Sequence, residues 1–286
     1  MTRIALTIVL TSALVGCGAD GGSAGDTVVA GFYPLAYAAE RIAGDDVEVR
    51  NLTPAGGEPH DFELSARDVG SVGDARLVLY LGGGFQPALE DAIESSGAEA
   101  LDLLDGLDLR AAGVDAPEGG NRDPHVWLDP TLYADIVLRI GRALGRDAPA
   151  RALAGELQEL DSELREGLSD CERREIVTSH AAFGYLAARY DLEQIAITGL
   201  SPEAEPSPAA LRELVEEVRS HGATTVFLET LVSPRLAETV AREVGATTAV
   251  LNPLEGLSER EAEEGADYFS LMRANLDALR EALGCR

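Results

Sequence analysis

Two kinds of apolar pattern alternate along the chain after residue 26. Short, nearly continuous apolar runs are typical of strands buried in a parallel sheet, whereas spacings of three and four residues are typical of helices. We predict strands at 27–31, 47–52, 76–81, 98–103, 175–179, 194–198, 224–228 and 247–251; the run 76–81 is nearly continuously apolar, whereas apolar and polar residues alternate at 47–52. Helical spacing follows at 34–44, 86–95, 182–190, 208–220, 234–244 and 266–283. The alternation predicts two α/β halves, each with a parallel sheet covered on both faces.

A long helical region separates the two halves. Leucine and isoleucine recur at spacings of three and four between residues 130 and 168, and a break is predicted near Asp147-Ala148-Pro149. The stretch 150–168 would be roughly 28 Å long at 1.5 Å per residue. We therefore predict a first lobe at 27–129, linking helices at 130–170 and a second lobe at 171–286. The expected fold is two doubly wound lobes with parallel sheets, joined by a long rigid helix, with a ligand-binding cleft between them.

The first residues have the pattern of an export signal. A short cationic start with Arg3 precedes a mostly apolar run at 4–15, and small residues lead to Cys17. A run of about a dozen residues is shorter than the roughly 20 that a membrane-spanning helix needs. We predict a lipoprotein signal peptide at 1–16, a lipid on Cys17 and a flexible glycine-rich tether at 17–26. The expected location is the outer face of the cytoplasmic membrane or the periplasm.

Two cysteines remain beyond the lipidation site. Cys171 and Cys285 form an even pair in an exported protein, where oxidation is permitted. We predict that they form a disulfide, which in the chain-entropy model would contribute on the order of 4–5 kcal/mol to stability.

Composition and charge exclude several classes of function. The chain has 286 residues, of which 45% are hydrophobic, enough for one or two packed cores. Its 23 basic and 50 acidic residues give a formal net charge of −27. A field of that sign repels phosphate backbones, so we do not expect a nucleic-acid-binding protein.

Three of the four histidines lie in turn-rich segments just behind predicted strands. These are His60, His125 and His180, whereas His221 precedes Gly222 at a predicted helix end, where a cation complements the helix dipole. Their separations, 125 − 60 = 65 and 180 − 125 = 55 residues, exclude a zinc finger or a site within one helix. Three imidazoles from separate loops can surround one zinc ion. Such a site should bind metal more weakly as the pH falls through the histidine range.

Several motifs around these histidines point to a known family. They are Pro59-His60-Asp61, the stretch 123–130 (DPHVWLDP), Ser179-His180, Phe227-Leu228-Glu229 and Leu251-Asn252-Pro253-Leu254. With them, the chain resembles the zinc-binding solute-binding lipoproteins of bacterial ABC transporters, a family that includes manganese-binding relatives. The resemblance implies two lobes joined by a rigid helix, one divalent metal ion between them and delivery of that ion to a membrane permease.

The resemblance also implies a set of ligands. His60 and His125 would bind the metal from the first lobe and His180 from the second, and a histidine at position 180 is similar to the zinc branch. Imidazole-rich sites favour Zn²⁺, so Mn²⁺ is less expected. At the fourth position many members have aspartate where this chain has Asn252, whose neutral amide oxygen is a weaker donor. The fourth ligand therefore stays open between Asn252, Glu58, Glu255 and water.

A further departure from the family concerns the segment 111–122. Many zinc-binding members have a long histidine-rich loop there, but this chain has a short segment without histidine. An auxiliary metal-collecting role of that segment is therefore not expected.

Other function classes fit a three-histidine site as well. A zinc hydrolase or hydratase would keep a water on the metal and would need a general base, for which Glu58, Asp61, Asp129 and Glu229 are available. We favour plainer roles for three of them: Asp61 and Asp129 as acceptors that orient imidazoles, and Glu229 as a hydrogen-bond partner at a strand end. An adhesin with a structural metal is a third possibility. We expect a monomeric binding protein rather than an enzyme.

Overall fold

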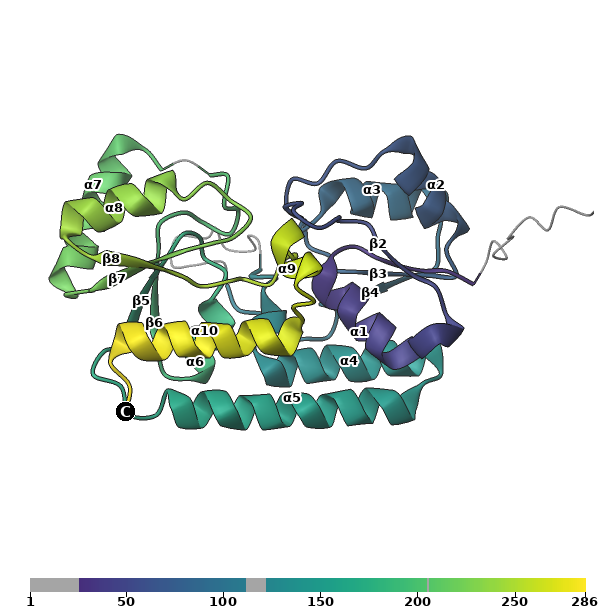
Figure 1. Ribbon diagram of the computed structural model, residues 1–286. Coiled ribbons are helices and arrows are strands. Elements are labelled where there is room, and N and C mark those ends of the chain that lie inside the picture. The colour runs from purple at the N-terminus through teal and green to yellow at the C-terminus, as the bar shows by residue number, and fades with distance from the viewer. Residues whose placement is uncertain (1–25, 112–121, 205) are drawn as a thin grey trace, which may run out of the picture.

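The computed structural model describes residues 26–111, 122–204 and 206–286, and it contains two four-stranded sheets, one in each lobe (Figure 1). All pairings within both sheets are parallel. The first sheet has the order β2-β1-β3-β4 and the second β6-β5-β7-β8. The strands are β1 (Val28–Ala30), β2 (Val49–Asn51), β3 (Leu77–Tyr80), β4 (Ala100–Asp102), β5 (Glu175–Thr178), β6 (Glu193–Ala196), β7 (Thr225–Leu228) and β8 (Thr247–Val250). The predicted fold class is confirmed, and each strand lies within its predicted run except β6, which begins one residue earlier, at Glu193.

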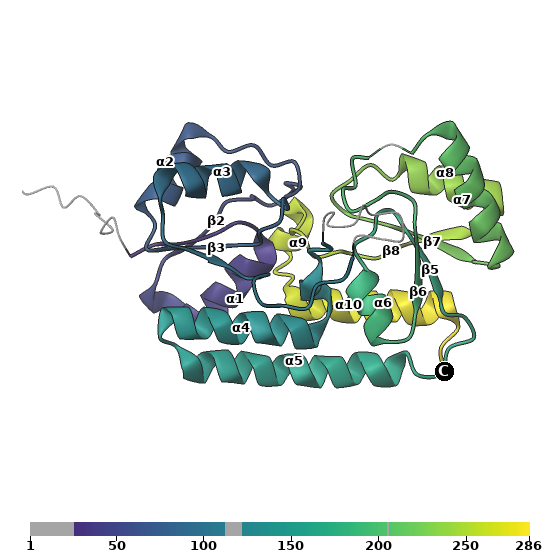
Figure 2. The same cartoon turned by 180° about the vertical axis from the view of Figure 1, so that it is seen from behind.

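Helices cover both faces of the first sheet, which explains the continuous apolar sequences of its inner strands β1 and β3. On one side lie α1 (Tyr33–Ala43) and α4 (Pro130–Leu144), and on the other α2 (Ala66–Asp74) and α3 (Pro87–Ser96) (Figures 1 and 2). Successive side chains of a strand point to opposite faces. In β3, Leu79 accordingly joins the core on the α1 side, whereas Val78 packs with Leu89 on the α3 side.

The second sheet is built in the same way. The helices α6 (Gly184–Arg189) and α10 (Tyr268–Leu283) lie on one side, and α7 (Pro208–Ser220) and α8 (Arg235–Val244) on the other (Figure 1). In β5, Ile176 belongs to the core shared with the first lobe, whereas Val177 packs with Val240 of α8 in a smaller core. Both sheets are therefore doubly wound, as predicted.

The long helix α5 (Asp147–Gly167) lies beneath both lobes (Figure 1). The predicted break between the linking helices is displaced, because α4 ends at Gly145, whose φ of +68° is a left-handed helix end. Pro149 lies inside the first turn of α5, where its missing N–H breaks no helical hydrogen bond. Arginines from both lobes pair with α5: Arg41 of α1 with Glu156, and Arg273 of α10 with Glu163, each at 2.8 Å. The proposed lobe boundaries stay a prediction.

Three short helices complete the described chain. They are η1 (Gly44–Asp46), η2 (Val126–Leu128) and α9 (Glu259–Glu263). The sequence pattern predicted neither α2 nor α9, and both begin with a capping box, formed by Ser65 with Asp68 and by Ser258 with Glu261.

The predicted disulfide is present: Cys171 and Cys285 are bonded at an S–S distance of 2.00 Å. The bond ties the last turn of the chain to the segment that follows α5. The predicted signal peptide, Cys17, nearly all of the tether and most of the segment 111–122 lie outside the described residues. Of the helices in the described ranges, none combines the length and the apolar character needed to cross a bilayer.

Candidate metal site

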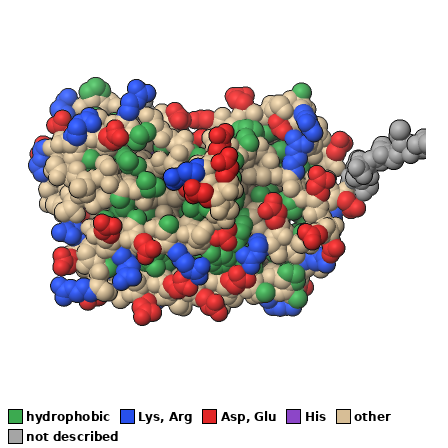
Figure 3. Space-filling model, viewed as in Figure 1, with side chains coloured by type: hydrophobic (Ala, Val, Ile, Leu, Met, Phe, Trp, Pro, Cys, Tyr) green, Lys and Arg blue, Asp and Glu red, His purple; other side chains and the backbone are tan. Residues whose placement is uncertain are grey.

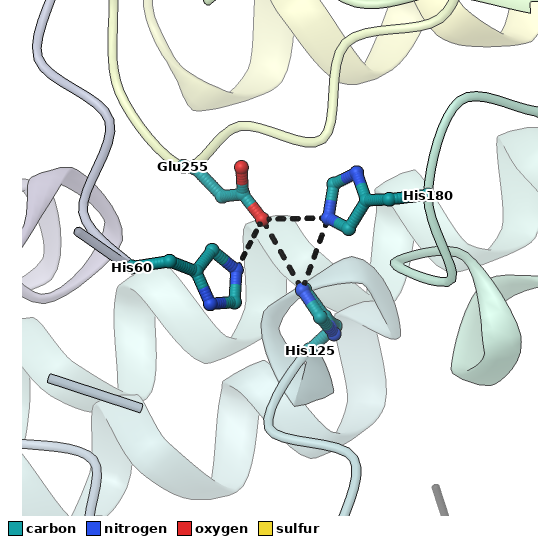
Figure 4. Close-up of side chains that lie close together, drawn as sticks. All are labelled: His60, His125, His180 and Glu255. Atoms are coloured by element: carbon teal, nitrogen blue, oxygen red, sulfur yellow. Dashed lines mark hydrogen bonds and ion pairs between the residues drawn. The ribbon is translucent and has the colours of Figure 1, made fainter. Parts of the chain in front are cut away.

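Three imidazoles and one carboxylate meet at a single point between the lobes (Figure 4). Glu255 Oε1 lies 3.2 Å from His60 Nε2, 3.2 Å from His125 Nε2 and 3.1 Å from His180 Nε2. The Nε2 atoms of His125 and His180 are 3.4 Å apart, and all four ligand atoms lie within 4.8 Å of one another. The structure thus brings together the three histidines that the sequence singled out.

The spacing of these atoms suits a small tetrahedral cation. Zinc ligands at about 2.0–2.1 Å from the metal in a tetrahedron are about 3.3–3.4 Å apart. Four of the six separations between the ligand atoms, from 3.1 to 3.4 Å, are close to that edge length. The other two pairs, which join His60 to His125 and to His180, lie within 4.8 Å.

Each ligand comes from a loop that follows a strand of one of the two sheets. His60 follows β2, and His125 precedes η2 in the connection after β4; both belong to the first lobe. His180 follows β5 directly, and Glu255 follows β8. Carboxyl ends of parallel strands point toward the space between the lobes, so residues distant in sequence converge there. The imidazoles of His125 and His180 are fully buried, and Glu255 is only 1% exposed.

Carboxylates orient two of the imidazoles from behind. Asp123 Oδ1 accepts hydrogen bonds from the backbone N and Nδ1 of His125, at 3.0 and 2.7 Å. Glu229 accepts from the backbone N of His180 at 3.0 Å and from its Nδ1 at 2.7 Å. Because a carboxylate only accepts, Nδ1 carries the proton in both rings, and Nε2 is directed to the cluster. Glu229 is thus the hydrogen-bond partner that we expected.

Asp61 and Asp129 do not have the predicted orienting role. Asp61 is exposed, and its backbone N donates to Glu58 at 3.1 Å. Asp129 caps α4 by accepting from the backbone N of Thr131 at 2.8 Å. The orienting carboxylate of His125 is instead Asp123, the first residue of the DPHVWLDP stretch. Its position two residues before the histidine was the signal that could have identified it.

The fourth position also differs from the resemblance. Glu255, one of the open alternatives, supplies the fourth ligand atom of the cluster. The side chain of Asn252 is engaged elsewhere: its Oδ1 accepts from the backbone N of Leu254 at 2.8 Å, and its Nδ2 donates to Glu261 at 2.9 Å. Glu58 accepts from the backbone N of His60 at 3.1 Å and so fixes the loop rather than joining the cluster.

The charges of the site stabilise one another. Burial alone would raise the pKa of Glu255, but the three imidazoles hold it well below its usual value. Burial opposes a charge on His180, yet Glu255 and Glu229 raise its pKa to about 10. Burial and the nearby Glu255 carboxylate raise the pKa of Glu58 to about 7. Burial lowers the pKa of His60, so the mutual stabilisation of charge is between Glu255 and the imidazole of His180.

The site is hidden from the face drawn in Figure 3. Among the described residues, no histidine is visible on this face, and carboxylates are spread over both lobes. His221, the fourth histidine, lies away from the site as the C-cap of α7. Its Nδ1 donates to the carbonyl of Glu217 at 2.9 Å, and this hydrogen bond raises its pKa. The predicted capping role of His221 is confirmed.

Comparison with known proteins gives a consistent result. Residues 28–282 match the model of a family described as the periplasmic zinc-uptake complex component A. The chain is 38% identical over 275 residues to the zinc-binding lipoprotein AdcA of Streptococcus pneumoniae. The match covers 89% of this chain and 55% of that protein. It is 34% identical over 277 residues to the high-affinity zinc uptake system protein ZnuA of Bacillus subtilis. This match covers 90% of this chain and 87% of that protein. The chain thus spans about half the length of the streptococcal AdcA proteins that it matches.

Solved structures show the same likeness. The Zn(II)-bound ZnuA-like domain of Streptococcus pneumoniae AdcA superposes with a TM-score of 0.74 at 37% identity, covering 90% of this chain and 98% of that one. The laminin-binding protein Lmb of Streptococcus agalactiae, described as having adhesin and metal-transporting activity, gives a TM-score of 0.81 at 31% identity. That match covers 91% of this chain and 100% of Lmb.

Proposed function

The chain belongs to the family of the zinc-uptake complex component A, and from this premise we propose that it captures Zn²⁺ between its lobes and delivers it to an ABC permease. One observation carries the proposal: His60, His125, His180 and Glu255 bring four ligand atoms within 4.8 Å of one another. The relatives whose names specify zinc binding support the same cargo.

The donor set favours zinc over manganese. Three imidazoles and one carboxylate are a typical zinc environment, whereas Mn²⁺ prefers sites richer in oxygen. The carboxylates Asp123 and Glu229 are bonded to the far side of the imidazoles, where they make the rings better donors without adding oxygen ligands. We therefore propose Zn²⁺ as the physiological cargo.

The same donor set argues against the hydrolase alternative. A catalytic zinc keeps a coordination position open for water or substrate, and a closed four-ligand site does not. Glu255 supplies the fourth protein ligand, so the ion would be held by protein atoms alone. Membership in a family of uptake components points in the same direction.

Capture begins with the cation entering the space between the lobes. The net charge of −27 attracts cations, although salt screens this field beyond about 8 Å at 0.15 M. The ion displaces protons from the Nε2 atoms of His125 and His180 and takes the place of those protons beside Glu255. Docking on the permease then reverses capture.

The cellular setting follows from the same proposal. We propose that the protein is exported, that a lipid on Cys17 anchors it to the membrane, and that it acts as a monomer. The lipoprotein name of the pneumococcal relative supports export and the lipid anchor. Replacing Cys17 by Ala should move the protein from the membrane fraction to the soluble fraction of fractionated cells.

Zinc titration of a His125→Ala variant tests the function. We expect a large loss of zinc affinity with an unchanged circular dichroism spectrum, because the imidazole is a ligand and the fold does not depend on it. His221→Ala is the matched control, since this exposed histidine caps α7 far from the cluster. Equal zinc affinities of wild type and His125→Ala would overturn the proposal.

Adhesion is a second candidate function with one observation behind it. The Lmb structure is described as that of a protein with both adhesin and metal-transporting activity. Binding of immobilised laminin by this protein, measured with and without bound zinc, would support adhesion. Absence of laminin binding in both states would exclude that role and leave zinc capture unaffected.

A further inference from the structure

The backbone just before Glu255 has a rare conformation. Leu254 has a φ of +56°, in the left-handed region that side chains other than glycine seldom adopt, and its own side chain is fully buried. Among the described non-glycine residues, only Asp191 also has a positive φ. Such a conformation persists where the surroundings hold it in place. Here it directly precedes the carboxylate that contacts all three imidazoles.

The side chain of Asn252 holds this turn. Its Oδ1 accepts from the backbone N of Leu254 at 2.8 Å, and its Nδ2 donates to Glu261 Oε1 at 2.9 Å. Because the Glu261 carboxylate only accepts, the amide must turn its Nδ2 toward Glu261, which leaves Oδ1 for Leu254. Asn252 is only 4% exposed, so water cannot readily replace either bond.

Neighbouring side chains hold the rest of the segment. Asn275 accepts from the backbone N of Asn252 at 2.8 Å and donates its Nδ2 to the carbonyl of Asn252 at 2.7 Å. Trp127 donates its indole N–H to the carbonyl of Pro253 at 2.8 Å. Proline has no N–H, so the next backbone donor is that of Leu254, which Asn252 binds.

We propose that Asn252 is a positioning residue of the metal site, which sets the direction of Glu255 through the turn at Leu254. This inference rests on the proposed zinc capture and deepens it. It also explains why the position holds an amide. An aspartate would place a second buried carboxylate against Glu261, and the repulsion would pull its oxygen away from Leu254.

A donor–acceptor exchange tests this role. Asn252→Asp should weaken Zn²⁺ binding by about 10–100-fold, the range typical of residues that support metal ligands, and should change the visible absorption of bound Co²⁺. In the double variant Asn252→Asp/Glu261→Gln, the new amide can donate to the new carboxylate. Both readouts should then return to nearly the wild-type values. Ser207→Ala, which removes the cap of α7, is the control for lost stability alone.

The outcomes separate this inference from the proposed function. If Asn252→Asp binds Zn²⁺ like wild type with the same Co²⁺ spectrum, or if the exchange restores neither readout, the positioning role is overturned while zinc capture stands. If wild type itself does not bind Zn²⁺, the proposed function of zinc capture is wrong, and the positioning role that rests on it is wrong as well. In the single variant Glu261→Gln, the amide oxygen must keep accepting from the backbone N of Ser258, so its Nε2 faces the Nδ2 of Asn252 and two donors oppose each other. If Asn252→Asp does not fold, the same measurements are made on Glu261→Gln instead.

Discussion

Glu229 binds His180 twice, at the backbone N and at Nδ1, and thereby fixes both the position and the tautomer of this imidazole. We predict that Glu229→Gln lowers zinc affinity by about 10–100-fold, because an amide can accept only one of the two hydrogen bonds. Competition with a chromophoric chelator measures the affinity. Glu213→Gln, on the exposed face of α7, removes the same charge without touching the site and should bind zinc like wild type. Equal losses in both variants would show that only net charge matters.

The identity of the fourth ligand can be resolved with two isosteric variants. Glu255→Gln should reduce zinc affinity by more than 100-fold, beyond the effect of residues that only support ligands, since it replaces a ligand carboxylate by a neutral amide. Glu58→Gln keeps an acceptor for the backbone N of His60 and should cost less than about 10-fold. Isothermal titration with Zn²⁺ compares the two. The reverse order of effects would assign the fourth position to Glu58.

Acid should weaken the junction between α5 and α6. Burial would raise the pKa of Asp161, but hydrogen bonds from Arg189 and Tyr190 outweigh it and hold the pKa below its ordinary value. A lowered carboxyl pKa contributes stability above the unfolded-state pKa, and this contribution is lost as the pH falls below about 4. We expect Asp161→Asn to lower the free energy of unfolding by about 1.5 kcal/mol at pH 7, at the low end for charged hydrogen bonds because Arg189 is partly exposed.

Urea unfolding at a series of pH values checks this expectation. The difference between wild type and Asp161→Asn should shrink from pH 7 toward pH 3. A difference that stays constant in acid would mean that the Asp161 charge does not contribute.

Removal of the disulfide should cost stability but not function. The bond joins residues separated by 114 positions, and a loop of about that length corresponds to about 4–5 kcal/mol in the chain-entropy model. We predict that the double variant Cys171→Ser/Cys285→Ser loses about this much free energy of unfolding in urea. Its zinc affinity should stay within about twofold of wild type, because the bond lies at the chain end (Figure 1). A tenfold loss of affinity would contradict this separation.

The predictable strands and helices are those in which the apolar residues of the sequence are also the buried residues of the structure. The inner strands β1 and β3 are continuous apolar runs, because helices cover both faces of the sheet there, whereas the edge strands β2, β6 and β8 include polar residues. Helix α2 was missed because its sequence contains Gly70 and Gly73 and it buries only Val72 fully. Its capping box, Ser65 with Asp68, was the available signal. The break between α4 and α5 was misplaced because Pro149 can serve a helix start as well as an interruption.

The site was predictable only in part, for a similar reason. The histidines lie in motifs, but their partners depend on how distant segments meet. Glu229 lies 49 residues from His180, and Glu255 reaches the cluster only because the chain turns at Leu254. Nothing in the residue type of Leu254 indicates a left-handed conformation. A ligand delivered by such a turn therefore remained one alternative among several.

The main hydrophobic core does not stop at the lobe boundary. It extends from Val28 in the first strand to Leu283 in the last helix, whereas α7 and α8 pack on a separate, smaller core. Helix α7 fully buries a single side chain, Val218. Because the lobes share this core, they should unfold together in one cooperative calorimetric transition on heating. Because α7 buries so little, its backbone amides should exchange with deuterium well before those of α4 and α5.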